Sequence, residues 1–74
     1  MNLVTFGVNL RYFRIRKGLT LQELAERLHV SANYLSTLEN NNGKIKPEFL
    51  PRLCAELGIQ LTDLFEATAE RRIY

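Results

Sequence analysis

One side of a predicted helix over residues 32–40 carries side chains that can hydrogen-bond to another molecule. Leu35 and Leu38 fall on the opposite side at helical spacing, which leaves four residues facing outward: Ala32, Asn33, Ser36 and Thr37. An Asn amide can pair with adenine through two hydrogen bonds, hydroxyls can donate or accept, and a methyl group can contact a thymine methyl. Many helices carry a solvated polar face of this composition, so the pattern by itself indicates only a candidate surface.

Groups that could perform catalysis or bind a metal are scarce. The chain has one His and one Cys, which excludes an intramolecular disulfide and a multi-cysteine zinc site. Cys54 lies between Leu53 and Ala55 in an apolar helical pattern, and we expect it to be buried as a small hydrophobe. His29 falls at a turn between two helical patterns. These residues cannot form a nucleophile–base pair, so we expect a protein that is not an enzyme and needs no cofactor.

Two short amphipathic helices have to position the outward-facing residues. Thr20 and Glu23 form a capping-box pattern that starts the first of them, and apolar residues recur at helical spacing up to Leu28. Ser31 is an N-cap candidate for the second. Because so few residues separate the two helices, they must meet at a sharp turn. This is the geometry of a helix-turn-helix, whose second helix can enter a DNA major groove.

The complete pattern predicts an all-α chain with five helices in a single domain over residues 1–74. We expect the helices at about 5–17, 21–28, 32–40, 47–57 and 61–66, with Gly18 and Gly58 ending the first and the fourth. The run from Asn40 to Gly43 supplies turn residues that accept a positive φ. The core of the domain then covers about residues 5–66, and a C-terminal tail covers 67–74. No strand alternation, repeat or linker is visible.

The composition agrees with a small folded domain. Hydrophobic residues make up 46% of the 74-residue chain, which is ample for a core. The net charge of +2 permits a polyanionic partner without identifying one. No apolar run reaches the length of a membrane span, and the N-terminus lacks the apolar region of a secretory signal. We therefore expect a cytoplasmic protein with no membrane partner.

The order of the motifs resembles the Cro/C1-type (XRE-like) helix-turn-helix domains of phage repressors, and is similar to the small controller proteins of restriction–modification systems. The resemblance covers about residues 6–65. The matching residues are Leu10, Arg14, Lys17, Gly18, Leu19, Thr20, Glu23, Leu24, Ala25, Val30, Ser31, Leu35, Ser36, Leu38, Glu39, Leu57, Gly58, Ile59, Leu64 and Phe65. The resemblance implies a compact five-helix, lambda-repressor-like DNA-binding domain.

The resemblance also implies that the helix over residues 32–40 is the recognition helix. Its outward-facing residues would contact base edges, with Asn33 and Thr37 the strongest candidates. Contacts to the DNA backbone would come from helix N-termini, whose exposed amides attract phosphate, and from the loop after the recognition helix. The candidates for backbone contacts are Thr20, Leu21, Gln22, Tyr34, Asn40, Asn41, Asn42, Lys44 and Lys46.

Two of these positions depart from the family pattern. Leu21 stands where many family members have a Gln that touches the DNA backbone, and Asn41 stands where the family has a Gly. Two roles are open for Tyr34, since its ring can pack beside the turn or its hydroxyl can bind a phosphate. Arg14 and Glu39 match a family ion pair that joins the first helix to the end of the third, and we assign this pair a structural role.

The first helix carries a second apolar stripe. The stripe consists of Val4, Val8, Tyr12 and Ile15, nearly opposite the core-facing residues Phe6, Leu10 and Phe13. Either the C-terminal tail folds over this stripe or another subunit covers it. Candidates for dimer contacts in the last helix and the tail are Leu61, Leu64, Phe65, Ile73 and Tyr74.

These features predict a small homodimeric transcriptional regulator that binds a pseudo-palindromic site on double-stranded DNA. The alternative is an antitoxin or another protein-interaction module, with a protein partner and a secondary ability to bind DNA. DNA binding by the purified chain alone would favour the first hypothesis. DNA binding that needs a partner protein would favour the second.

Overall fold

The structure, a computed structural model, describes residues 3–40 and 43–66, and these residues form helices and no strands. The elements are α1 (Leu3–Arg16), α2 (Leu21–Leu28), α3 (Ala32–Glu39), a 3₁₀ turn (Pro47–Phe49), α4 (Leu50–Leu57) and α5 (Leu61–Phe65). The prediction of an all-α chain with five helices is confirmed. Among these residues, no helix is both long and apolar enough to pass through a bilayer.

The helix ends follow from local capping chemistry. Thr20 Oγ1 accepts the Glu23 amide at 3.0 Å, and the Thr20 amide donates to Glu23 Oε1 at 2.8 Å, so the predicted capping box of α2 is present. Ser31 Oγ accepts the Tyr34 amide at 3.0 Å and starts α3. Gly58 follows α4 with a φ of +66°, a left-handed conformation that glycine adopts without strain.

The start of α4 differs from the sequence prediction. Residues Pro47–Phe49 form a separate 3₁₀ turn, and the α-helix begins only at Leu50. Pro51 then stands in the first turn of α4, where its missing amide would have had no partner inside the helix. A single helix from Pro47 would have placed Pro51 one full turn inside, where a proline breaks the hydrogen-bond ladder.

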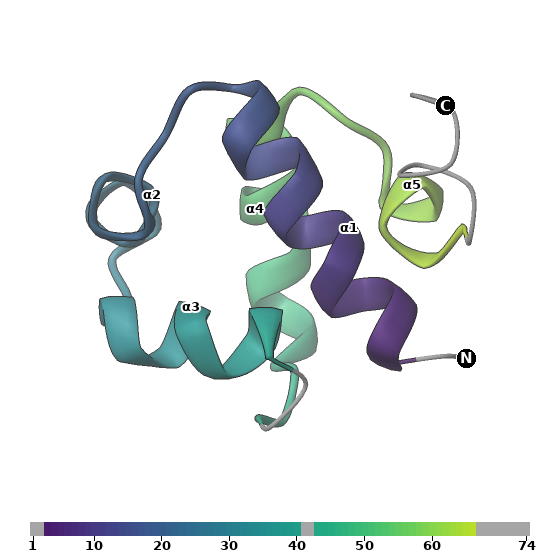
Figure 1. Ribbon diagram of the computed structural model, residues 1–74, viewed down its shortest axis with the longest axis horizontal. Helices are drawn as coiled ribbons and strands as arrows, with labels where there is room; N and C mark the ends of the chain where they lie inside the picture. Colours follow the sequence, from purple (N-terminus) through teal and green to yellow (C-terminus); the bar gives the residue numbers. More distant parts are fainter. Residues whose placement is uncertain (1–2, 41–42, 67–74) are drawn as a thin grey trace.

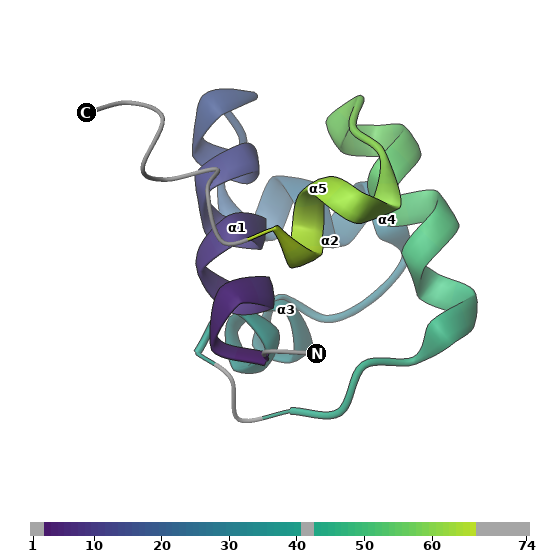
Figure 2. The same cartoon turned by 90° about the vertical axis from the view of Figure 1, so that its right-hand side faces the viewer.

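Leucine side chains from all five helices, together with Phe6 and Phe49, meet in one core. α1 packs against α3 and α5, and α2 packs against α3 and α4. In Figure 1, α1 passes in front of α4, with α5 on one side and α2 and α3 on the other. The view in Figure 2 places α5 beside α1. The large apolar side chains that are fully buried are Phe6, Leu10, Leu24, Leu35, Leu38, Leu53 and Leu64.

Asn9 is a buried polar residue whose role the sequence did not reveal. Its side chain is 2% exposed and lies on α1. The Asn9 Nδ2 group donates to the carbonyl oxygens of Asp63 at 3.2 Å, Leu64 at 3.0 Å and Glu66 at 2.6 Å. A helix C-terminus leaves carbonyl groups without partners. Asn9 supplies partners for those of α5 and so fastens α5 to α1.

The structure changes the expectation for Leu64 and gives the exposure of part of the second apolar stripe of α1. Leu64 is fully buried inside the chain, so it offers no surface to a second copy. In the second stripe of α1, Ile15 is 56% exposed, while Val8 and Tyr12 are half-buried. The Val4 side chain and the tail residues Ile73 and Tyr74 lie outside the described residues, as do Asn41 and Asn42.

Cys54 is buried, as expected for a small hydrophobe. Burial raises the pKa of its thiol, and the nearby Asp63 carboxylate raises it further. Both effects disfavour the reactive thiolate.

Candidate nucleic-acid interface

A left-handed residue makes the sharp turn between α2 and α3. His29 has φ 59° and ψ 41°, and its amide donates to the carbonyl of Glu26 at 3.3 Å. The Val30 amide donates back to Ala25 O at 3.0 Å, and α3 begins two residues later. Leu35 and Leu38 anchor α3 in the core. The pair α2–α3 is therefore a helix-turn-helix, with α3 along one edge of the molecule (Figure 1).

The outward face of α3 combines exposed and partly covered side chains. Asn33 is exposed, Ser36 is half-buried, and Ala32 packs partly against the core. The Asn40 side chain, which caps the end of this face, is exposed and donates to Ser36 Oγ at 3.4 Å. Asn33 is thus the predicted base-contact residue with the most accessible hydrogen-bonding groups.

Thr37 has less freedom than the sequence suggested. Its hydroxyl donates to the Tyr34 carbonyl at 2.6 Å. The backbone of Gly43 passes so close that a Cβ atom on Gly43 would lie 2.7 Å from Thr37 Oγ1. The hydroxyl can therefore only accept a further hydrogen bond in this arrangement. Gly43 has no positive φ, so it provides space for the loop and not the turn geometry we expected from the Asn–Gly run.

The Tyr34 ring is packed against the protein, although the contacts it makes are with Phe49 and the segment 43–46. Its ring meets Phe49 edge-on, with ring centroids 5.6 Å apart. Its hydroxyl donates to the Lys44 carbonyl at 3.2 Å and accepts the Lys46 amide at 3.3 Å. The single hydroxyl proton is thus already donated, and none remains for a phosphate.

Two groups of potential phosphate ligands belong to segments next to α3. Lys44 and Lys46 are exposed on the segment 43–46, which follows α3 in the chain. Leu21 and Gln22 begin α2, which packs against α3, and the first amides of α2 have no carbonyl partner within the helix. The Glu23 carboxylate lies in the same turn, and its hydrogen bonds with Thr20 lower the pKa of Glu23 and keep it charged. This charge partly offsets the attraction of the α2 N-terminus for phosphate.

A buried ion pair holds α3 in place. Arg14 Nε lies 2.6 Å from Glu39 Oε2, and Arg14 Nη2 donates to Glu39 Oε1 at 3.3 Å. The remaining Nη1 group of Arg14 donates to the Leu19 carbonyl at 2.7 Å. The two side chains are only 12% and 6% exposed. The predicted pair is present, and it ties the end of α3 to α1 and to the turn before α2.

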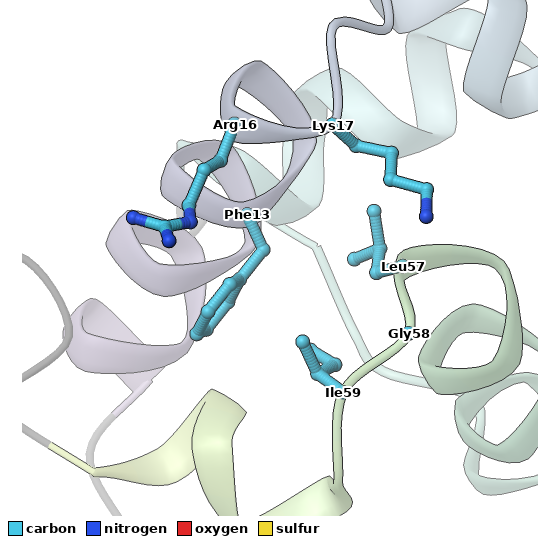
Figure 3. A pocket seen from close by; sticks show the side chains of 6 residues that line it. All are labelled: Phe13, Arg16, Lys17, Leu57, Gly58 and Ile59. Carbon is cyan, nitrogen blue, oxygen red and sulfur yellow. The ribbon is translucent and has the colours of Figure 1, made fainter.

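A small hollow of about 170 Å³ opens at the end of the molecule opposite α3 (Figure 3). It is lined by Phe13, Arg16, Lys17, Leu57, Gly58 and Ile59. Figure 3 shows the Lys17 side chain extending toward Gly58, while the Arg16 side chain points the other way. The hollow is therefore separate from the surface formed by α3. No group of three His, Cys, Asp or Glu side chains that could hold a metal ion occurs in residues 3–40 and 43–66.

Comparison with known proteins agrees with this geometry. The sequence model of the helix-turn-helix family HTH_3 matches residues 10–64. A propionyl-CoA carboxylase regulator of Cereibacter sphaeroides is 38% identical over 65 residues, which are 88% of this chain. The match spans only 14% of the length of that regulator.

Solved structures of regulators are similar over most of the chain. The restriction–modification controller protein C.AhdI of Aeromonas hydrophila has a TM-score of 0.79 at 30% identity, covering 85% of this chain and 96% of C.AhdI. SinR, a master regulator for biofilm formation, was solved in complex with DNA. Its TM-score is 0.76 at 32% identity, covering 82% of this chain and 98% of that SinR chain.

The family consists of DNA-binding regulators and not of enzymes. The α2–α3 geometry, the match to the family model and the similar solved structures show that this chain belongs to the XRE-type helix-turn-helix family.

Proposed function

We propose that this chain binds double-stranded DNA sequence-specifically as a homodimer and regulates transcription. In this proposal α3 lies in the major groove, with Asn33 and Ser36 at base edges and Ala32 and Thr37 beside them. The observation that carries the proposal is the exposed Asn33 side chain on the outward face of α3. The proposed phosphate contacts come from the α2 N-terminus and from the exposed Lys44 and Lys46.

The two sets of contacts have different tasks. Phosphate contacts supply affinity for any DNA and orient the protein, whereas base contacts discriminate among sequences. The candidates for phosphate contacts among the described residues are Thr20, Leu21, Gln22, Asn40, Lys44 and Lys46.

A second copy of the chain is the proposed partner in dimerisation. Leu61 is 48% exposed on α5, and Phe65 is half-buried against Phe6, with ring centroids 5.4 Å apart. These two residues are the described members of the predicted dimer surface that remain accessible. A two-fold dimer would present two copies of α3 about 34 Å apart, the length of one DNA turn.

Selection of bound DNA from a random pool tests this function. Purified wild-type protein should enrich a pseudo-palindromic site whose half-sites lie about 10 base pairs apart, centre to centre. Light scattering at tens of micromolar should give the mass of two chains. A pool that shows no enrichment contradicts sequence-specific binding. An asymmetric site together with a monomeric mass contradicts the dimer.

A protein-interaction module is the second candidate function. The observation that favours it is the exposed Ile15 near the C-terminal end of α1, on the helix that also contributes Phe13 and Arg16 to the hollow. This end of the molecule lies opposite α3 and would stay accessible on DNA (Figures 1 and 2). Enrichment of a DNA site only in the presence of a partner protein would support this candidate.

A further inference from the structure

The segment 43–46, which carries Lys44 and Lys46, is fastened to α3 by one tyrosine. The Tyr34 hydroxyl bonds to the backbone of both lysines, donating to the Lys44 carbonyl and accepting the Lys46 amide. The Lys46 Nζ atom lies 5.5 Å from the centroid of the Tyr34 ring, within the range of a cation–π contact. Phe49 holds the ring from another side. One side chain of α3 thus sets where both lysine backbones lie.

The absence of a side chain at Gly43 completes the attachment. The segment reaches α3 beside Thr37 and Leu38, and a Cβ atom on Gly43 would lie 2.7 Å from Thr37 Oγ1. Real Cβ atoms do not approach an oxygen so closely, so any larger residue would push the segment away from α3. Gly43 and Tyr34 therefore fix the segment at its start and along its length.

We propose that Tyr34 is a positioning residue for DNA binding, which holds Lys44 and Lys46 at a fixed place relative to the base-facing side of α3 without contacting DNA itself. This inference rests on the proposed function. Lysine side chains are long and flexible, so the position of their backbone decides which phosphates they can reach. A segment held in place before binding also loses less conformational entropy on binding. The Tyr34 hydroxyl therefore acts on the phosphate contacts and leaves base discrimination to Asn33.

The variant Tyr34→Phe isolates this role. Phenylalanine keeps the ring contacts to Phe49 and Lys46 and removes only the two hydrogen bonds to the segment. We expect the variant to lose affinity for the selected site and for a random duplex by the same factor. Each phosphate contact that is lost should lower the salt slope of log K by about 0.9. Between 50 and 200 mM salt, the advantage of the wild type should then shrink about 3.5-fold per lost contact.

Matched variants separate positioning from a general effect on stability. Tyr12→Phe removes another tyrosine hydroxyl, one that accepts from Arg16 on α1, and it should leave the salt slope unchanged. Gly43→Ala should reproduce the uniform loss of affinity. In a chain with Lys44→Gln and Lys46→Gln, the further change Tyr34→Phe should have no additional effect on DNA binding, because the hydroxyl acts through those lysines.

Three results would overturn the proposal. The first is a Tyr34→Phe loss confined to the selected site, which would make Tyr34 a base-reading residue. The second is an unchanged salt slope, and the third is a loss of the same size in the chain without the two lysines. A measurement without DNA tests the attachment of the segment 43–46 by Tyr34 separately from the proposed function. Hydrogen exchange of the Lys46 amide should speed up in Tyr34→Phe. Unchanged exchange refutes this attachment even where the wild type binds DNA. Failure of the wild type to bind any DNA refutes the proposed function itself.

Discussion

At the scale of single residues, three largely buried polar side chains organise this small domain. Arg14 and Glu39 neutralise each other between α1 and the end of α3, and Asn9 supplies hydrogen-bond donors to the end of α5. The sequence predicted the ion pair because both residues stand in a recognisable motif order. It could not predict the Asn9 contacts, because a single Asn on a helix does not show which distant carbonyl groups it will face.

Removing one member of the ion pair should be costly. Glu39→Ala leaves the Arg14 guanidinium largely buried without its counter-charge, and we expect a loss of about 3–5 kcal/mol in the free energy of unfolding. The double variant Arg14→Met, Glu39→Leu should recover much of this loss, because no unpaired charge remains. Chemical denaturation followed by circular dichroism measures both. If Glu39→Ala is as stable as the wild type and only DNA binding falls, Glu39 acts at the DNA surface and the structural role is wrong.

Asn9 should matter for the attachment of α5. Asn9→Ala leaves the carbonyl groups of Leu64 and Glu66 without this donor, and we expect a loss of about 1–3 kcal/mol in the free energy of unfolding. The exposed Asn40 serves as the control, since Asn40→Ala should change stability by less than about 0.5 kcal/mol. Equal stability losses in the two variants would contradict the role assigned to Asn9.

At the scale of elements, the positions of the helices could be predicted more accurately than the paths between them. Capping residues and apolar spacing located α2 and α3 to within a residue. The predicted start of α4 was wrong. A 3₁₀ turn at Pro47 followed by a helix from Leu50 keeps Pro51 in the first helical turn, where its missing amide breaks no hydrogen bond. The close approach of Gly43 to Thr37 depends on the path of a loop, which no periodic pattern encodes.

The turn between α2 and α3 should be stabilised by a glycine. His29 adopts the left-handed conformation, which costs a residue with a Cβ atom about 1 kcal/mol relative to glycine. We expect His29→Gly to raise the free energy of unfolding by up to about 1 kcal/mol, and His29→Ala to give no gain. Thermal unfolding of the two variants checks this. A stability gain with alanine as large as that with glycine would show that φ is not the source of the cost.

The capping box of α2 should make stability depend on pH in the acidic range. The hydrogen bonds with Thr20, helped by Arg27, lower the pKa of Glu23 below its ordinary value of 4.5. The charged carboxylate therefore stabilises the fold above pH 4.5, and this contribution is lost as the pH falls through the lowered value.

Comparison of the wild type with Glu23→Gln isolates this contribution. The wild type should have the higher thermal midpoint at pH 6, and the difference should shrink as the pH falls toward 3, because protonation through the lowered pKa of Glu23 removes its charge. Other carboxylates titrate equally in both proteins and cancel. A difference of the same size at both pH values would contradict the assignment to the Glu23 charge.

At the scale of the whole molecule, the helix-turn-helix pair, the attached segment 43–46 and the Arg14–Glu39 ion pair hold α3 with Asn33, the proposed base-reading residue, exposed on its outer face. The fold class and the family could be predicted from the sequence because the motif order spans nearly the whole chain. The candidate site could be predicted only in part. Helical spacing identified the outer face of α3, but only the packed loop shows that Thr37 is partly covered and that Asn33 is accessible.

The central claim, that α3 reads DNA bases through Asn33, is tested most directly by one comparison of affinities. The measurement is the affinity of the wild type and of Asn33→Ala for the selected site and for a random duplex at the same salt concentration. We predict that the variant loses about 1–3 kcal/mol on the selected site, while its affinity for the random duplex and its stability stay nearly unchanged. Equal losses on both duplexes, or no loss on the selected site, would contradict the account.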